Sequence, residues 1–452
     1  MDLRPTAARN EPLSRADAAW LHMEQATNHF VVTSLMLLEE PLELERLREA
    51  LRRKMPLLRR LRQRVVEPAW PLAAPHWEDD PDFALDAHTH RVALPAPGGR
   101  MQLEELISDL VGQPLDLQRP PWQSYLIEDY EGGSAVITRL HHCLGDGAAL
   151  VQMQLALTDT RRAGWLEHTS PAAVVHEGKG LDLAGLAAGA VRQLLTDPGR
   201  AAGLLRSAVS AAGTLARLSL LDPDPPTALR AAPGVLKRTA WSGPLQLPAV
   251  RSIARATGST VNDVLVSVVA GGLGAYLRNH ESGPRPAYVR AMVPVDLRPR
   301  REPVTQGNHF SLVLLELPVA VRDPLERLMR VKIEMDRIKT SLEAQVGWVV
   351  VTGLGLLPAA LERPAAGFFA DKATLVLTNV IGPRRRRYLA GSPILAQTFW
   401  EPESGGLGLG VSIFSYAGQV ILGAVADANS VPWPRQLIEA FEHSFEELSA
   451  SV

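Results

Sequence analysis

The sequence is poor in cysteine and has no strong excess of charge of either sign. Cys143 is the single cysteine among 452 residues, so an internal disulfide is excluded, and such low usage fits a reducing compartment. The formal net charge of −2 excludes an overall basic nucleic-acid-binding protein. Lysine is scarce as well, since the 47 basic residues comprise 41 arginines and 6 lysines, a bias that fits the codon composition of a GC-rich genome.

Long uncharged apolar runs are also rare. The first 20 residues mix charges with prolines and contain no apolar segment typical of a secretory signal. The run closest to a membrane span, 344–361, is uncharged but contains three glycines and one proline. It barely reaches the ~20 residues that a span requires. We therefore predict a buried or interfacial helix there.

The length and a change of composition indicate two domains joined by a connector. A chain of 452 residues is longer than a single hydrophobic core usually supports. A polar segment, followed by an Ala/Leu/Arg-rich stretch at helical spacing, separates the two halves. We predict a first half at 1–160, a helical connector at 161–235 and a second half at 236–452.

Apolar periodicity predicts both helices and strands in each half, and hence a mixed α/β (α+β) fold. The expected helices cover 13–24, 43–54, 247–257, 260–277, 323–344 and 434–449, and the expected strands cover 30–38, 124–127, 135–140, 287–295, 310–317, 373–378, 409–416 and 419–425.

The stretch 135–157 combines ionisable side chains with a change from strand to helix. Its opening apolar residues predict a buried strand, and apolar residues spaced three and four apart from Leu150 predict a helix. Between them lie the adjacent histidines His141 and His142, followed by Asp146 at the position of a helix N-cap. Two imidazoles and a carboxylate within six residues favour a catalytic role.

Acid–base catalysis is the first hypothesis for this stretch. A histidine whose pKa lies near neutral is the usual group that removes a proton from an alcohol. The positive end of the following helix favours a neutral imidazole, whereas Asp146 favours the protonated form. Successive strand residues face opposite sides, so His141 and His142 are not expected to reach one substrate together. Strand parity does not indicate which of them is the base.

Three other hypotheses stay open on the residues alone. The histidines and Asp146 could ligate a metal ion, although their spacing does not match the helical histidine pair of zinc hydrolases. Cys143 could be a thiolate nucleophile or simply a small residue in a turn. The stretch could also be purely structural, a capped helix beside two core histidines.

The second half offers one further polar candidate. Thr260 and Asp263 have the spacing of a capping box, which explains Asp263 structurally. Asn262 lies between them, where asparagine is not a preferred residue. Its amide could donate a hydrogen bond to a developing negative charge.

An ordered set of motifs resembles one family. Residues 141–147, HHCLGDG, fit the HHxxxDG signature of the chloramphenicol-acetyltransferase-like acyltransferases, which include the condensation domains of peptide synthetases. Within that superfamily the chain is most similar to the bacterial wax ester synthase/acyl-CoA:diacylglycerol acyltransferases. The motifs that carry this resemblance are LSRADAAWLHME at 13–24, Pro120-Pro121-Trp122 with its middle residue changed, TVNDVL at 260–265, PVDLR at 294–298, GNHFS at 307–311 and TNVIGP at 378–383.

The resemblance implies two chloramphenicol-acetyltransferase-like sandwich domains that meet at a central tunnel. The HHxxxDG turn, with His141 and His142, would lie at the middle of the tunnel. His142 would remove the proton from a bound hydroxyl, which then attacks the acyl-CoA thioester without an acyl-enzyme. Asp146 would brace the turn, Gly147 would let the substrate approach it, and Asn262 would orient the substrate or the oxyanion.

The same resemblance implies further contacts. Trp122, Pro121 and Asp263 would contribute to substrate binding, with Trp122 as a wall of the tunnel. Asp146 would pair with an arginine, for which the candidates are Arg59, Arg60 and Arg298. The four arginines at 384–387 could form a basic entrance for coenzyme A.

We therefore expect an O-acyltransferase that moves a long-chain acyl group from acyl-CoA to diacylglycerol or to a long-chain alcohol. It would need no metal ion and no cofactor apart from acyl-CoA as co-substrate, and it would bind no nucleic acid. It would be cytoplasmic and associate peripherally with the inner membrane or lipid bodies. The alternatives are a carrier-protein-dependent condensation-type or polyketide-associated acyltransferase, and a catalytically dead lipid-binding relative.

Overall fold

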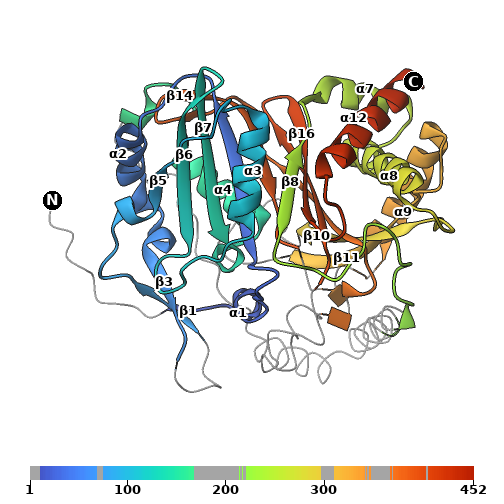
Figure 1. Cartoon of the computed structure of the whole chain (residues 1–452), viewed down its shortest axis with the longest axis horizontal. Helices are drawn as coiled ribbons and strands as arrows, with labels where there is room; N and C mark the ends of the chain where they lie inside the picture. Colours follow the sequence, from blue (N-terminus) through green and yellow to red (C-terminus); the bar gives the residue numbers. More distant parts are fainter. Residues whose placement is uncertain are drawn as a thin grey trace, which may run out of the picture.

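Two large β-sheets lie next to each other in the protein, and helices cover both (Figure 1). The computed structural model describes residues 11–68, 75–166, 220–296, 310–341, 370–403 and 406–452, with a few isolated positions between these ranges. Strands and helices are mixed in both parts, so the expected α/β fold is confirmed.

The first sheet has six strands, and its two faces pack against different helices. Alternate residues of its strands point to opposite faces. Met36 and Val136 belong to a core shared with α2 (Leu44–Lys54) and α4 (Gly147–Leu157). The strand order is β13 (Tyr388–Leu389), β14 (Ser392–Trp400), β2 (Val31–Leu38), β7 (Gly133–His141), β6 (Trp122–Tyr130) and β5 (Thr89–Arg91).

The other face of the first sheet packs against α3 (Arg100–Val111). Leu103 and Ile107 of this helix are buried in one cluster with Leu35 and Ile137 of the sheet. These two strand residues adjoin Met36 and Val136 in sequence, so they point to the face opposite α2 and α4. Helix α3 also contacts the edge of the second sheet, so it lies between the two sheets (Figure 1).

The second sheet has seven strands and carries four helices on one face. These helices are α7 (Leu247–Ala256), α8 (Val261–His280), α9 (Pro324–Thr340) and α12 (Pro434–Ala450). The strand order is β11 (Phe310–Leu317), β10 (Val289–Asp296), β12 (Leu375–Ile381), β15 (Leu409–Tyr416), β16 (Gln419–Asp427) and β8 (Lys237–Trp241), with β9 (Leu245–Gln246) also paired to β16.

Strand β14 connects the two sheets. It comes from the later part of the chain, yet it pairs antiparallel with β2 of the first sheet, from Ile394 opposite Leu38 to Trp400 opposite Thr33. Trp400 then packs in one core with Ile421 and Val425 of the second sheet. The first sheet is therefore built from an early and a late segment of the chain.

Several expected elements are found with bounds close to those predicted. The strands expected at 310–317 and 409–416 have those bounds, and the helix expected at 43–54 begins one residue later. The pattern did not predict α3 or β14. The connector at 161–235 and the apolar run at 344–361 fall largely outside the described residues, and the domain boundaries stay a prediction.

A third sheet and one short helix complete the first part of the chain. The sheet consists of β1 (Glu11–Pro12), β4 (His76–Asp79) and β3 (Gln63–Val66). Helix α1 (Arg15–His22) begins at Ser14, whose hydroxyl accepts a hydrogen bond from the backbone N–H of Asp17. A serine hydroxyl is a typical N-cap at this position.

Within the described residues, no single helix is long and apolar enough to cross a membrane. The pair α7 and α8 passes that test only when taken together, and the two helices meet at an angle of 100°.

The close packing of α8 on α12 leads to a first prediction. A Cβ at Gly272 would lie 2.2 Å from Cδ1 of Phe441 and 2.9 Å from its backbone nitrogen. Gly272→Ala should therefore lower the free energy of unfolding by about 1–3 kcal/mol through overpacking, as measured by urea denaturation. Gly283, where a Cβ would meet no atom within 4 Å, gives the matched control Gly283→Ala. Equal stability of the two variants would contradict this packing.

Candidate active site

The two histidines and the aspartate lie where β7 passes into α4. His141 ends the strand, one 3-10 turn (His142–Leu144) follows, and Asp146 is the N-cap of α4. Its Oδ1 accepts a hydrogen bond of 3.0 Å from the backbone N–H of Ala149. The helix start predicted at Asp146 is thus confirmed.

His141 points into the protein interior. Its side chain is fully buried, and its Nδ1 accepts a hydrogen bond of 3.1 Å from the backbone N–H of Cys143. Its Nε2 lies 3.9 Å from Oε2 of Glu24. Burial, together with the nearby His142 and His29, lowers the pKa of His141 to about 3. His141 is therefore neutral and supports the turn.

His142 faces a cavity between the two sheets. Its ring stacks on Trp20 with centroids 4.7 Å apart, and Phe310 lies 6.0 Å away. Its Nε2 is 3.5 Å from Oε2 of Glu401. Burial lowers the pKa of His142, but the hydrogen bond and charge of Glu401, and then the charge of Asp146, outweigh burial and raise this pKa above its usual value.

This cavity, which we call the main cavity, has a volume of about 370 Å³ and is lined by both parts of the chain. The first part supplies aromatic rings and the start of α4, and the second part supplies strands β10, β11 and β12. Its polar lining residues are His142, Asp146, Gln152, Asp296, Thr378, Asn379 and Glu401.

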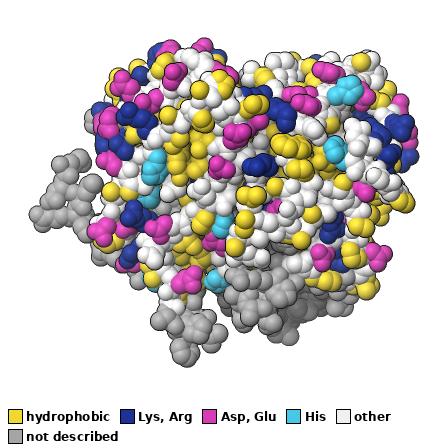
Figure 2. Space-filling view, viewed as in Figure 1, with side chains coloured by type: hydrophobic (Ala, Val, Ile, Leu, Met, Phe, Trp, Pro, Cys, Tyr) yellow, Lys and Arg dark blue, Asp and Glu magenta, His cyan; other side chains and the backbone are white. Residues whose placement is uncertain are grey.

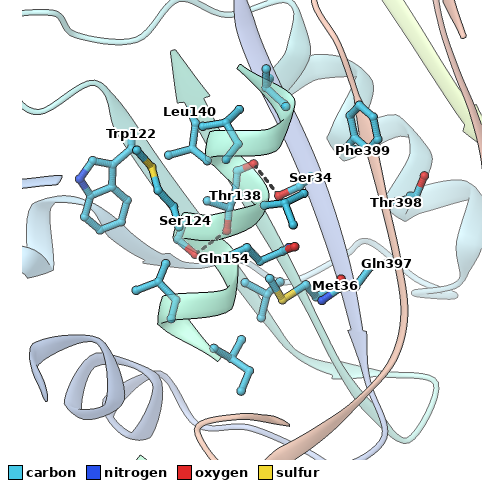
Figure 3. A pocket seen from close by; sticks show the side chains of 18 of the residues that line it. Ser34, Met36, Trp122, Ser124, Thr138, Leu140, Gln154, Gln397, Thr398 and Phe399 are labelled. Atoms are coloured by element: carbon cyan, nitrogen blue, oxygen red, sulfur yellow. Dashed lines mark hydrogen bonds between the residues drawn. The ribbon is translucent and has the colours of Figure 1, made fainter. Parts of the chain in front are cut away.

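A second cavity of about 90 Å³, the side cavity, adjoins the main cavity and runs between the first sheet, α2 and α4 (Figure 3). Its walls are mostly apolar, and Trp122 forms part of them. A short row of hydroxyls crosses the sheet face, where Ser34 Oγ donates to the carbonyl of Thr138 and Ser124 Oγ lies 3.5 Å from Thr138 Oγ1. Gly147, Val151, Val380 and Glu401 line both cavities.

Gly147 lies where the two cavities join. A Cβ at this position would come within 3.1 Å of Cγ2 of Val380 and 3.7 Å of Oε1 of Glu401. The glycine therefore keeps the passage beside the helix start open, which agrees with a close approach of substrate to the turn.

Asn262 does not line either cavity. Its Oδ1 accepts a hydrogen bond of 2.6 Å from Nδ2 of Asn379, and Asn379 is the residue that lines the main cavity. Asn262 thus meets the cavity lining through Asn379, and its role toward the substrate stays a prediction.

Asp263 and Pro121 also lie outside both cavities. The Asp263 carboxylate accepts a hydrogen bond of 2.8 Å from the backbone N–H of Thr260, whose hydroxyl accepts one from Asp263. The carbonyl of Pro121 accepts a hydrogen bond of 3.0 Å from the backbone N–H of His141. These hydrogen bonds hold a helix start and a strand end, and the expected substrate contacts of Asp263 and Pro121 stay a prediction.

The structure shows contacts of some of the arginines considered in the sequence analysis. Arg59 and Arg60 both donate to Glu11, and Arg298 lies outside the described residues, so the arginine partner of Asp146 stays a prediction. Arg387 donates to the carbonyls of Leu155 and Thr158. It therefore holds the end of α4 and is not a free member of a basic entrance.

Two family models match this chain. One, described as the wax ester synthase/diacylglycerol acyltransferase catalytic domain, covers residues 13–265, and the other, the WS/DGAT C-terminal domain, covers residues 306–449. The chain belongs to the WS/DGAT family. It is an acyltransferase.

Relatives along the whole chain agree with this assignment. A probable diacylglycerol O-acyltransferase of Mycobacterium tuberculosis (strain H37Rv) is 29% identical over 446 residues, covering 97% of this chain and 96% of the relative. A putative diacylglycerol O-acyltransferase of the same strain is 32% identical over 409 residues, covering 84% and 83%.

Solved structures support the fold. The wax ester synthase/diacylglycerol acyltransferase of Marinobacter aquaeolei VT8 matches with a TM-score of 0.71 at 22% identity, covering 98% of this chain and 99% of that one. The first condensation domain of the calcium-dependent antibiotic synthetase matches with a TM-score of 0.61 at 17% identity, covering 98% and 96%. The expected superfamily fold is thereby confirmed.

The sequence analysis singled out none of Trp20, Asn379 and Glu401 in this WS/DGAT protein. Trp20 lies in the recognised opening motif and Asn379 lies in TNVIGP, so a motif marked the position of each. Glu401 had none, because it follows a strand that the apolar pattern did not predict.

The thiolate and metal hypotheses find no support in the described residues. Cys143 is buried, and burial raises the pKa of its thiol well above the usual value, so the thiol stays protonated. No group of three or more His, Cys, Asp or Glu side chains in the described ranges is arranged to hold a metal ion.

This burial predicts that Cys143→Ala retains acyltransferase activity. The substitution removes a protonated thiol from a packed core, so we expect turnover close to that of the wild type and a loss of stability of about 1 kcal/mol. Steady-state kinetics and thermal unfolding measure the two effects. A folded Cys143→Ala protein without activity would restore the thiolate hypothesis.

Proposed function

We propose that the protein transfers a long-chain acyl group from acyl-CoA to the hydroxyl of diacylglycerol or of a long-chain alcohol. The observation that carries this proposal is the position of His142 in the main cavity, where an apolar side cavity opens beside it. A general base beside an apolar cavity suits lipid substrates.

The proposed step is a direct displacement with His142 as general base. The acceptor O–H gives its proton to Nε2 of His142 while the oxygen attacks the thioester carbonyl carbon. The C–S bond then breaks, and the coenzyme A thiolate takes the proton from the imidazolium. The nearby carboxylate of Asp146 favours the imidazolium that exists between these two transfers.

The remaining lining residues divide into polar and apolar sets. Gln152, Thr378 and Asn379 supply hydrogen-bonding groups near His142, suited to the thioester and the glycerol or alcohol head. The side cavity, with residues such as Met36, Val136 and Leu150, is suited to an alkyl chain. No metal ion or other cofactor enters this scheme.

We also propose that the substrates reach the protein from a lipid surface, as expected for a cytoplasmic protein bound peripherally to the inner membrane or to lipid bodies. Ile381 lines the main cavity and is 75% exposed, which supports delivery of an apolar substrate at this edge. We propose no nucleic-acid partner, since the face visible in Figure 2 carries acidic and basic side chains interspersed with apolar ones.

The main test removes the proposed base. His142→Ala should lower turnover by about 10²–10⁴-fold because general base catalysis contributes that much. Radiolabelled palmitoyl-CoA is offered hexadecanol and diacylglycerol in parallel, and the products are separated by chromatography. Near-normal turnover in a folded His142→Ala protein would contradict the mechanism. A requirement for an acyl carrier protein loaded with phosphopantetheine would instead favour a condensation-type reaction.

The side cavity gives a second test. Ser34 lies half-buried on the sheet face of this cavity, and Ser34→Phe would fill part of the space. We expect kcat/KM to fall for palmitoyl-CoA or hexadecanol and to change little for butyryl-CoA with butanol, because short chains do not reach the ring. Ser34→Ala, which leaves the space open, is the matched control. The same chain-length profile in both variants would show that no substrate chain occupies this cavity.

A further inference from the structure

Glu401 occupies an unusual position at the junction of the two cavities. It directly follows Trp400, the last residue of β14, and its side chain is only 10% exposed. One carboxylate oxygen, Oε2, lies 3.5 Å from Nε2 of His142. The other, Oε1, faces Gly147 at the first turn of α4, where a Cβ would be 3.7 Å away.

The surroundings of Glu401 stabilise a negative charge. The start of α4 is the positive end of an 11-residue helix, which stabilises a negative charge beside it. A buried carboxylate is costly unless a positive or hydrogen-bonding group faces it, and His142 is placed to be that group when it is protonated. Glu401 is not explained as a packing residue, since apolar side chains such as Val151 and Val380 complete the same wall.

We infer that Glu401 is a positioning residue that holds the imidazolium of His142 during acyl transfer. The inference rests on the proposed function and adds a residue to it. The acceptor hydroxyl gives its proton to His142 Nε2, the carboxylate of Glu401 stabilises the positive charge of the imidazolium, and the same proton leaves to the coenzyme A thiolate. No proton is gained or lost by Glu401 in the cycle.

The other groups around His142 are accounted for. Asp146 at the start of α4 and Asp296 at the end of β10 carry the further charges of the main cavity. Trp20 of α1 and Phe310 of β11 present only rings to the imidazole. His141 on β7 is neutral, and Glu24 faces His141. Among the described residues, Glu401 is a carboxylate placed against Nε2 of His142, at 3.5 Å.

The direction of the pH effect follows from these charges. Burial lowers the pKa of His142, and Glu401 is the strongest influence that raises it. His142 must be neutral to accept a proton, so activity falls as the pH drops below this pKa. Removal of the Glu401 charge therefore lowers the pKa of His142. The acidic limb of the rate profile must then move to lower pH.

The experiment measures kcat/KM against pH for the wild type, Glu401→Gln, Glu401→Asp and the control Glu105→Gln, which removes an exposed carboxylate of α3. We expect the acidic limb of Glu401→Gln to move down by about one pH unit and kcat to fall by about tenfold or more, with KM little changed. Glu401→Asp keeps the charge and should stay close to the wild-type limb, and Glu105→Gln should not differ from the wild type.

Two results would overturn the inference. An unchanged limb in a folded Glu401→Gln protein, with or without a loss of kcat, would mean that Glu401 is only structural. If Glu401→Gln lost the acidic limb altogether and His142→Ala retained activity, Glu401 would itself be the base.

A second measurement separates this inference from the proposed function. NMR titration follows the ring signals of the 12 histidines, and His142→Ala identifies the signal of interest. We expect a lower pKa of His142 in Glu401→Gln than in the wild type, whatever substrates the enzyme uses. An unchanged pKa would contradict the inference, whereas inactivity of the wild type with acyl-CoA and both acceptors would contradict only the proposed function.

Discussion

The pairing of β14 with β2 is the interaction on which the site depends. It brings a strand from the later part of the chain into the first sheet. There β14 lies beside β2, whose other neighbour is β7, the strand that leads into the histidine turn. Strand β2 is paired on its other side with β7, so β14 and the turn after β7 are held at a fixed distance. The cavities lined by both parts of the chain exist because of this arrangement.

The second constraint is electrostatic, and it separates two adjacent histidines. His141 has no carboxylate within hydrogen-bonding distance among the described residues, so burial dominates and its pKa falls to about 3. His142 is also buried, but carboxylates on α4 and after β14 reverse the effect of burial. These neighbours in sequence therefore have opposite pKa shifts, because His141 ends the strand and points into the interior whereas His142 begins the turn and faces the main cavity.

Local signals in the sequence predicted local structure well. The caps at Asp146 and Thr260 are found where side-chain chemistry and spacing indicated them, because an N-cap involves residues only three positions apart. The HHxxxDG turn was predicted to join a strand to a helix, which is what the structure contains. Its family assignment rested on ordered motifs, and the family models agree.

Contacts between distant parts of the chain were not predictable in this way. Strand β14 carries the buried polar residues Gln397 and Thr398, which interrupt the apolar pattern of a buried strand. Glu401 follows it, and its contact with His142 spans more than 250 positions of the sequence. Asn262 was recognised as unusual, but its bond to Asn379 depends on the placement of α8 against β12, which no local signal contains.

The central claim is that acyl transfer at His142 is direct and passes through no acyl-enzyme. The most direct measurement incubates the purified protein with radiolabelled palmitoyl-CoA in the absence of an acceptor, quenches with acid and examines the protein for covalent label. The account predicts an unlabelled protein and release of coenzyme A only after hexadecanol or diacylglycerol is added. Stoichiometric label on the protein, released upon addition of an acceptor, would contradict it.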